Sequence, residues 1–198
     1  MCGRYHIDFE IEEIREIFEE IEKRYPGVIM STGEIFPTNN VPIITPEGPK
    51  PAFWGFQKWD GKGHIINARG ETVETKKTFS KPFEKQRCII PTTGFYEWTK
   101  DKTKTKYFFE LPDDSILYLA GLYEYYENEL CMVILTHRPN ESMDGVHDRM
   151  PVILTDDQLT LWLNETDEAR QIIEMNSPLL KRTNLSDYIP EQESFLDE

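Results

Sequence analysis

The first apolar residues of the chain recur at helical spacing. Isoleucine and phenylalanine stand among charged residues at Ile11, Ile14, Ile17, Phe18 and Ile21. This spacing places the apolar side chains on one face of a helix. We therefore predict one amphipathic helix over residues 10–24, which the Pro26-Gly27 pair brings to an end.

Beyond this helix the apolar segments become shorter and are separated by Gly, Pro and charged turns, which is typical of β-strands. In chain order they read VPIIT, PAFWGF, HIINA, CIIP, GFYEW, KYFFEL, ILYLAGLYEY and LCMVILT. Helical patterns return at residues 78–86, after Asp156 as an expected N-cap, and at residues 167–175. The sequence predicts one α+β domain over residues 1–198, with a curled, barrel-like, mainly antiparallel β core flanked by helices.

The composition is that of a folded, globular protein. The 198-residue chain is 38% apolar and 12% aromatic, and no linker rich in Pro, Gly or Ser divides it. It contains neither an apolar run of about 18 residues nor an apolar signal region, so we expect neither a membrane span nor a secretory signal peptide. These features favour a cytoplasmic protein without a membrane partner.

The cysteines and histidines form no recognisable metal-binding or disulfide pattern. Cys2, Cys88 and Cys131 are widely separated, and the histidines show no HxxxH or HExxH spacing. Cys88 and Cys131 lie inside apolar runs, so we expect both in the core. The sequence therefore predicts no metal, no cofactor and a reducing setting.

Cys2 stands directly behind the initiator methionine in the segment MCGRY. Removal of Met1 would give this residue a free α-amine beside its thiol. Such an amine has a pKa near ~7.7–8.0, against ~10.4 for lysine, so more of it is unprotonated at neutral pH. A 1,2-aminothiol condenses with an aldehyde to an imine, which the sulfur can close to a thiazolidine ring. A cysteine at this position can also be incidental.

The segment NARGE places polar groups where a predicted strand ends. Asn67 could form a hydrogen bond with an N-terminal amine or a reacting hydroxyl, and the planar guanidinium of Arg69 suits a phosphate. An ordinary strand end, in which the asparagine makes a turn, explains the segment equally well.

Two further residues suit proton transfer. Glu97 stands between large aromatic residues in GFYEW, where removal from water would fit a carboxyl to general acid–base work. On an alternating strand it could instead face solvent. His147 lies beside Asp148 and Arg149 ahead of an apolar strand, and histidine carries protons near neutral pH. A loop histidine tied to its neighbours is the alternative.

Taken together and in this order, these segments resemble the SRAP family (SOS response-associated peptidases). The matching segments are MCGRY, the WGF that follows a Phe, NARGET, RCIIPTTGFYEW, AGLYE, ILTHRPN and VHDRMPVIL. The resemblance covers residues 2 to about 165. The acidic remainder, residues 166–198, is not aligned with it.

The resemblance implies a sensor of abasic sites in single-stranded DNA, which protects the lesion during replication and the DNA damage response. An abasic site exposes a sugar aldehyde, and the family's N-terminal cysteine forms a covalent thiazolidine crosslink to it. On the matching residues, Cys2 would be the nucleophile through its amine and sulfur, and Asn67 would hold it in place. Glu97 would transfer protons during ring opening and crosslinking. His147 would act on the sugar hydroxyls and on the imine.

The resemblance also implies a DNA-binding surface. Its residues would be Gly3, Arg4, Trp54, Arg69, Thr136 and Arg149, with Trp54 as the DNA-facing tryptophan of a WG motif. The net charge of −14 argues against non-specific nucleic-acid binding. However, residues 61–106 hold 11 Lys or Arg against 5 Asp or Glu, an excess of 6. We expect these basic residues, with Arg4, Arg138 and Arg149, to line one face.

One position departs from the family pattern. Many relatives carry an asparagine two residues before an Ala-Pro, and Glu34 occupies that slot here. A glutamate near DNA phosphates would repel them. Either Glu34 points away from the DNA or this region binds DNA differently, with Asn40 as a candidate substitute contact.

Other functions stay open at this point. A thiol peptidase would use Cys2 with Glu97 or His147 as base, and autoproteolytic removal of Met1 and lyase-type chemistry are further activities to consider. A non-covalent single-stranded DNA-binding module would leave Cys2 incidental, and a metal or redox protein is the remaining alternative. For the DNA-reactive interpretation we expect a monomer that joins the nucleoid when it binds DNA.

Overall fold

The computed structural model describes residues 2–186 of the chain. Its helices are α1 (Glu12–Arg24), α2 (Lys77–Lys85), α3 (Asp156–Asn164) and α4 (Thr166–Glu174), with short 3-10 helices η1 (Gly70–Thr72) and η2 (Glu141–Met143). The amphipathic helix and the later helical segments predicted from the sequence are confirmed. The N-cap of α3 is Thr155 and not Asp156. The Thr155 N–H is satisfied by the Gln158 side chain at 3.1 Å, which stabilises this helix start.

Five strands form a closed ring. In order around the ring they are β12 (Glu129–His137), β4 (Gly48–Trp54), β3 (Asn40–Thr45), β8 (Arg87–Thr92) and β11 (Leu117–Tyr126). The ring closes because β11 also pairs with β12, and only the β12–β4 pairing within it is parallel. Three short strands pair with ends of the ring strands: β13 (Met150–Pro151) and β7 (Asn67–Arg69) with β12, and β14 (Ile153–Leu154) with β11. The predicted α+β fold with a barrel-like, mainly antiparallel core is confirmed.

A second sheet brings the two ends of the described chain together. Its antiparallel strands, in spatial order, are β15 (Lys181–Asn184), β10 (Lys106–Glu110), β9 (Gly94–Trp98), β1 (Tyr5–Ile7) and β2 (Gly33–Ile35). A separate two-stranded pair joins β5 (Phe56–Gln57) to β6 (His64–Ile65). The strands β1, β2 and β15 were not predicted, because each is too short to show an alternating pattern. The apolar strand expected after Arg149 is present as two short strands, β13 and β14.

The alternation of side chains along the barrel strands divides the core in two. On β8, Cys88 and Ile90 belong to a first core shared with β1, β9 and β10, whereas Ile89 belongs to a second core beneath α2, α3 and α4. Cys131 is also buried in the second core. The prediction that Cys88 and Cys131 lie in the core is thus confirmed.

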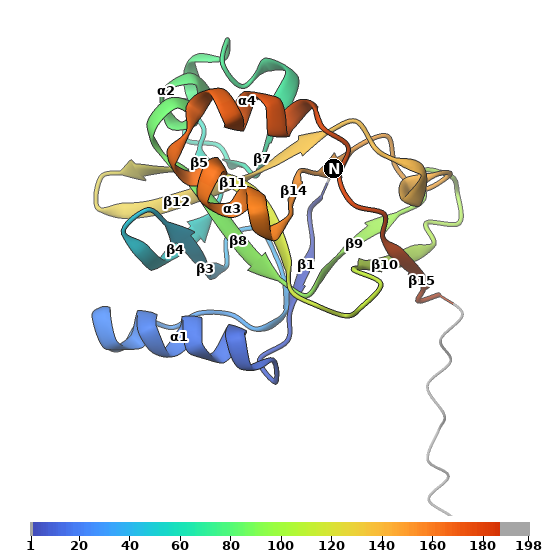
Figure 1. Ribbon diagram of the computed structural model, residues 1–198, viewed down its shortest axis with the longest axis horizontal. Helices are drawn as coiled ribbons and strands as arrows, with labels where there is room; N and C mark the ends of the chain where they lie inside the picture. The colour runs from blue at the N-terminus through green and yellow to red at the C-terminus, as the bar shows by residue number, and fades with distance from the viewer. Residues whose placement is uncertain (1, 187–198) are drawn as a thin grey trace, which may run out of the picture.

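The helices cover different parts of this framework. Figure 1 shows α2, α3 and α4 gathered on one side of the barrel, with α1 lying apart from them beyond β1 and β3. Phe83 of α2 contacts Trp162 of α3 across the second core. Among residues 2–186, no helix combines the length and apolar character needed to cross a membrane.

Candidate active site

Strand pairing places the start of the chain beside β9. In the register of β1 and β9, Tyr5 lies opposite Phe95, and the Tyr96 N–H donates to the Arg4 carbonyl at 2.9 Å. Continuing this pairing carries Cys2 towards Glu97, and both side chains are buried, with 0% and 4% of their surface exposed. The expectation that Glu97 faces the interior rather than solvent is confirmed.

Asn67 joins this region from the barrel. It begins β7, which runs parallel to β12 with Asn67 opposite Ile134. The next residue, Ala68, is buried in the second core, so the alternation of the strand turns Asn67 the other way. The Asn67 side-chain amide donates to the Cys2 carbonyl at 3.0 Å. This hydrogen bond fixes the backbone of Cys2 relative to the barrel.

His147 follows η2, and its ring is held in one tautomer. The Arg149 backbone N–H donates to His147 Nδ1 at 3.1 Å, which requires an unprotonated Nδ1 and places the ring hydrogen on Nε2. Asp148 Oδ1 is also 3.1 Å from Nδ1, a contact that becomes an ion pair only if the ring is protonated. Burial lowers the pKa of His147 even though the Glu97 carboxylate opposes this shift, so the neutral ring is favoured. Asp148 instead pairs with Lys100 at 2.6 Å.

Cys2, Asn67, Glu97 and His147 therefore come together and are called the Cys2 cluster below. Asn67 is bound to Cys2, while the Glu97 carboxylate acts electrostatically on both the Cys2 thiol and the His147 ring. The four residues come from the chain start, β7, β9 and the loop after η2. One thiol, one amide, one carboxylate and one imidazole can together support nucleophilic attack with proton transfer.

The Cys2 thiol is kept protonated by its surroundings. Its Sγ donates a weak hydrogen bond to the Arg4 carbonyl at 3.7 Å. Burial raises the pKa of this thiol well above its ordinary value, and the Glu97 carboxylate raises it further. A thiol in this state requires a base before it can attack, and the adjacent carboxylate is of the right type.

Trp54 does not face DNA, contrary to the sequence-based prediction. It ends β4 with its side chain fully buried, its ring centroid 5.0 Å from that of Tyr5. Its indole N–H donates to the Ile66 carbonyl at 3.0 Å. The exposed tryptophan is Trp59, on the loop between β5 and β6, with 99% of its surface exposed. Trp54 supports the barrel beneath the Cys2 cluster and cannot stack on a base.

We expect Trp54→Ala to lower the free energy of unfolding by about 3–5 kcal/mol, because it leaves a large cavity and an unpaired carbonyl. Urea unfolding followed by circular dichroism measures this change. Trp59→Ala is the matched control and should change stability by less than about 0.5 kcal/mol, since the side chain is exposed. Equal stabilities of the two variants would contradict the role given to Trp54.

Two other residues that were expected to contact DNA interact with groups of the protein itself. Thr136 is fully buried, and its hydroxyl donates to the Ala68 carbonyl at 3.3 Å, so the prediction that it contacts DNA is wrong. Both terminal nitrogens of Arg149 bind Glu71, and one of them also binds the Thr136 carbonyl. The Arg149 guanidinium thus braces the His147 loop against the end of β12, and a phosphate could bind it only by displacing Glu71.

One basic residue of the segment 61–106 departs from the expected basic face. Arg87 is buried, with 3% of its surface exposed, and its guanidinium donates to main-chain carbonyls of α2 and α3. The prediction that all basic residues of 61–106 share one face is therefore wrong at Arg87. Arg69 is exposed and makes no ion pair within the described part of the chain, and Gly3 is half-buried. Lys100 lies close to His147 through its ion pair with Asp148.

Glu34 does not point away from the expected DNA-binding region. Its Oε1 accepts hydrogen bonds from Arg4 Nη1 and from Lys106 Nζ, each at 2.9 Å. From the sequence, Lys106 was only one of the basic residues of 61–106. Its place beside Arg4 and Glu34 was not predicted, because it depends on β10 pairing with β9 rather than on a local motif. Asn40, the suggested substitute for the missing asparagine, is exposed at the start of β3.

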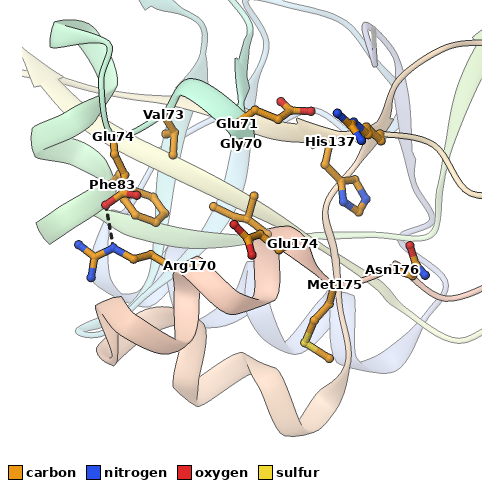
Figure 2. Close-up of a pocket in the computed structure, with 12 residues that line it drawn as sticks. Gly70, Glu71, Val73, Glu74, Phe83, His137, Arg170, Glu174, Met175 and Asn176 are labelled. Carbon is orange, nitrogen blue, oxygen red and sulfur yellow. Dashed lines mark hydrogen bonds and ion pairs between the residues drawn. The ribbon is translucent and has the colours of Figure 1, made fainter.

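A pocket of about 620 Å³ lies elsewhere, between η1, the end of β12 and α4. Figure 2 shows Glu74 and Arg170 paired at one end of it, with His137 at the other end. None of the four residues of the Cys2 cluster lines this pocket, whereas Arg138 does. Among residues 2–186, no group of three or more His, Cys, Asp or Glu side chains is arranged to hold a metal ion.

The chain is similar to a known protein family and to several named proteins. A family model described as SOS response associated peptidase (SRAP) matches residues 1–189. The chain is 37% identical over 180 residues to the abasic site processing protein YoqW of Bacillus subtilis, covering 83% of this chain and 80% of that protein. It is 25% identical over 188 residues to the abasic site processing protein YedK of Escherichia coli, covering 88% and 85% of the two chains.

Solved structures share the fold. A crystal structure of a Bacteroides thetaiotaomicron protein superimposes with a TM-score of 0.78 at 22% sequence identity, covering 92% of this chain and 91% of that one. A Bordetella bronchiseptica protein superimposes with a TM-score of 0.72, also at 22% identity, covering 92% of this chain and 99% of that one.

Proposed function

Because the chain belongs to the SRAP family of SOS response-associated peptidases, we propose that it processes abasic sites in single-stranded DNA by forming a covalent thiazolidine crosslink through Cys2. The relatives described above are named abasic site processing proteins, which supports DNA containing abasic sites as the target. The observation that carries the proposal is the Cys2 cluster, which surrounds a residue able to present an amine and a thiol together.

The chemistry begins after Met1 has been removed. The Cys2 amine attacks the C1′ aldehyde of the ring-opened sugar, and the resulting carbinolamine loses one water to give an imine. The Cys2 sulfur then forms a bond to the imine carbon. The thiol proton leaves the sulfur as the nitrogen gains a proton, and the five-membered thiazolidine closes. No oxidant or reductant is needed.

The amine is expected to react first. Burial and Glu97 raise the pKa of the Cys2 thiol, so at neutral pH little thiolate is present. The Glu97 carboxylate would accept the thiol proton when the sulfur attacks. The neutral His147 ring, with its hydrogen on Nε2, can donate towards the sugar oxygen as the ring opens. Asn67 keeps the Cys2 backbone in place throughout.

We expect Asn67→Ala to slow crosslink formation about fivefold to a hundredfold. The smaller value corresponds to one lost hydrogen bond of about 1 kcal/mol, and the larger one to a misplaced nucleophile. The rate is measured from the fraction of shifted protein on denaturing gels over time. Asn164→Ala is the control, because the Asn164 amide donates to the Thr160 carbonyl on α3, away from the cluster. An unchanged rate in Asn67→Ala would remove its positioning role.

The surroundings of Cys2 favour aldehyde capture over a thiol peptidase. Cysteine peptidases lower the pKa of the nucleophilic thiol with an adjacent charged histidine. Here burial and an adjacent carboxylate do the opposite, and burial favours a neutral His147. A thiazolidine, by contrast, requires the sulfur to attack only an imine that is already held within the same residue. Turnover of added peptides at a rate dependent on Cys2 would support the peptidase alternative.

The test uses purified protein and three single-stranded oligonucleotides of one sequence. One contains an abasic site, one is undamaged, and one contains an abasic site whose aldehyde has been reduced to an alcohol. We expect a boiling-resistant band on denaturing electrophoresis with the first oligonucleotide only. A band with the reduced site would show attachment by another reaction, and no band with the abasic site would contradict the proposal.

A further inference from the structure

The second sheet, with strand order β15-β10-β9-β1-β2, gathers charged and aromatic side chains on its outer face, beside the Cys2 cluster. The inward positions Tyr5, Ile35, Phe95 and Phe109 are fully buried, so the residues that alternate with them point outwards. The outward residues include Arg4, Glu34, Tyr96, Trp98 and Lys106. In the strand register Lys106 lies directly opposite Trp98, and Glu34 lies opposite His6.

A single carboxylate oxygen connects the two cations of this face. Glu34 Oε1 lies 2.9 Å from Arg4 Nη1 and 2.9 Å from Lys106 Nζ. The three side chains are about equally accessible, with 31%, 30% and 27% of the Arg4, Glu34 and Lys106 side chains exposed. Two donors that converge on one anionic oxygen form the arrangement that binds a phosphate oxygen.

Aromatic rings form the walls of this arrangement. The Arg4 guanidinium carbon lies 3.6 Å from the centroid of the Phe36 ring, and Phe36 is 42% exposed. Lys106 Nζ lies 4.1 Å from the centroid of Tyr96 and 5.4 Å from that of Trp98. Phe36 offers an exposed ring and Trp98 a partly exposed one, whereas Tyr96 is buried beneath Lys106. Cations beside accessible aromatic rings are typical of surfaces that bind single-stranded nucleic acid, because bases stack on the rings while the cations contact the backbone.

Glu34 is ionised in this setting. Partial burial by itself raises its pKa, but the hydrogen bonds from Lys106 and Arg4 outweigh burial, so the pKa lies below its ordinary value. The carboxylate cancels one of the two positive charges. A DNA phosphate that approached Arg4 and Lys106 would have to displace it.

We propose that Arg4 and Lys106 form a subsite for a DNA backbone phosphate, and that Glu34 occupies this subsite in the free protein as an internal competitor of the phosphate. This inference rests on the proposed function, since it assumes a DNA strand bound beside Cys2. Its consequence is selectivity. Undamaged single strands bind weakly because they must displace Glu34, whereas an abasic strand is retained once its aldehyde has reacted.

The test is non-covalent binding of undamaged single-stranded DNA, measured by fluorescence anisotropy over a range of salt concentrations. Glu34→Gln keeps an oxygen that accepts hydrogen bonds but removes the competing charge. We expect binding about three- to tenfold tighter at low salt, because two ion pairs no longer have to be broken. The plot of log affinity against log salt should become steeper by about 0.7, the value for one additional unpaired positive charge on a single strand.

Glu47→Gln is the matched control. Glu47 is ionised, pairs with Lys50 at 3.1 Å and lies on the turn between β3 and β4, so the substitution makes the same change in net charge. It should leave affinity and salt dependence unchanged. Lys106→Gln supplies a second measurement, since it removes a phosphate contact and should weaken binding and flatten the salt dependence. Thermal unfolding confirms that each variant is folded.

Two results would overturn the inference. Glu34→Gln could bind undamaged DNA no more tightly than the unmodified protein, or Glu47→Gln could tighten binding equally, which would indicate a general charge effect. Crosslinking to abasic DNA, measured on the same proteins, separates this failure from that of the proposed function. If the protein crosslinks to abasic DNA but Glu34→Gln leaves its affinity for undamaged DNA unchanged, only the competitor role of Glu34 is contradicted. If Glu34→Gln binds undamaged DNA more tightly but no protein crosslinks to abasic DNA, only the proposed covalent function is contradicted.

Discussion

Replacing Cys2 with alanine is expected to abolish the boiling-resistant adduct with abasic single-stranded DNA. The substituted chain would still present an α-amine once Met1 is removed, so the imine could form. Without sulfur, however, the imine cannot close to a ring, and water hydrolyses it during denaturation. Adding borohydride during the reaction would reduce this imine to a stable amine. We therefore expect Cys2→Ala to give no band alone but a band after borohydride treatment.

Two other substitutions sharpen this test. Cys2→Ser should give a weaker adduct or none, because an oxazolidine is less stable than a thiazolidine. Cys131→Ala is the control for loss of a buried cysteine, since this free thiol lies in the second core. It should form the adduct at the rate of the unmodified protein. If Cys2→Ala formed a full boiling-resistant band without borohydride, Cys2 would be incidental.

Replacing Glu97 with glutamine is expected to slow crosslink formation, reversal or both by about a hundredfold or more. Two effects oppose each other. The Glu97 charge contributes to the raised pKa of the Cys2 thiol, so its loss makes the thiolate easier to form. Its loss also removes the group that would accept the thiol proton, and general base catalysis is typically worth about 10²–10⁴-fold. The second effect should prevail, because burial, the larger cause of the raised pKa, remains.

The two directions of the reaction are measured separately. Formation is followed by stopping samples at set times on denaturing gels, and reversal by challenging the isolated adduct with an excess of a competing aldehyde. Glu124→Gln is the control. Glu124 is a partly buried carboxylate on β11 that pairs with Lys81 of α2, and it is not part of the Cys2 cluster. If Glu97→Gln formed and reversed the adduct at the rates of the unmodified protein, the proposed role of Glu97 would be wrong. Faster formation would mean that the charge acts only to suppress the thiolate.

Local sequence patterns were sufficient for much of the fold. The first helix is determined by its own apolar face, so its spacing alone predicted it over residues 10–24, and the structure has it at Glu12–Arg24. The long strands β11 and β12 alternate clearly between two buried faces. By contrast, β1 and β15 are formed by pairing with distant residues. Three or four residues in such a strand carry no period of their own, and their neighbours in the sheet lie far away along the chain.

The candidate site also has a part that the sequence predicted and a part that it did not. Motif order led to Cys2, Asn67, Glu97 and His147, and the structure brings these residues together. The prediction that Trp54 faces DNA was wrong, because a WG pattern does not reveal which face of β4 is turned into the barrel. The relation of Glu34 to Arg4 and Lys106 could not be read from the sequence, because it depends on the pairing of β2, β1, β9 and β10.

The most direct test of the central claim is the intact mass of the adduct after treatment with borohydride and then, under denaturing conditions, with iodoacetamide. A thiazolidine predicts the mass of the protein without Met1 plus the oligonucleotide less one water. It also predicts no hydrogen gained from borohydride, and alkylation of Cys88 and Cys131 only. An imine has the same initial mass but gains two hydrogens and leaves Cys2 open to alkylation. That result, or an adduct that retains Met1, would contradict the account.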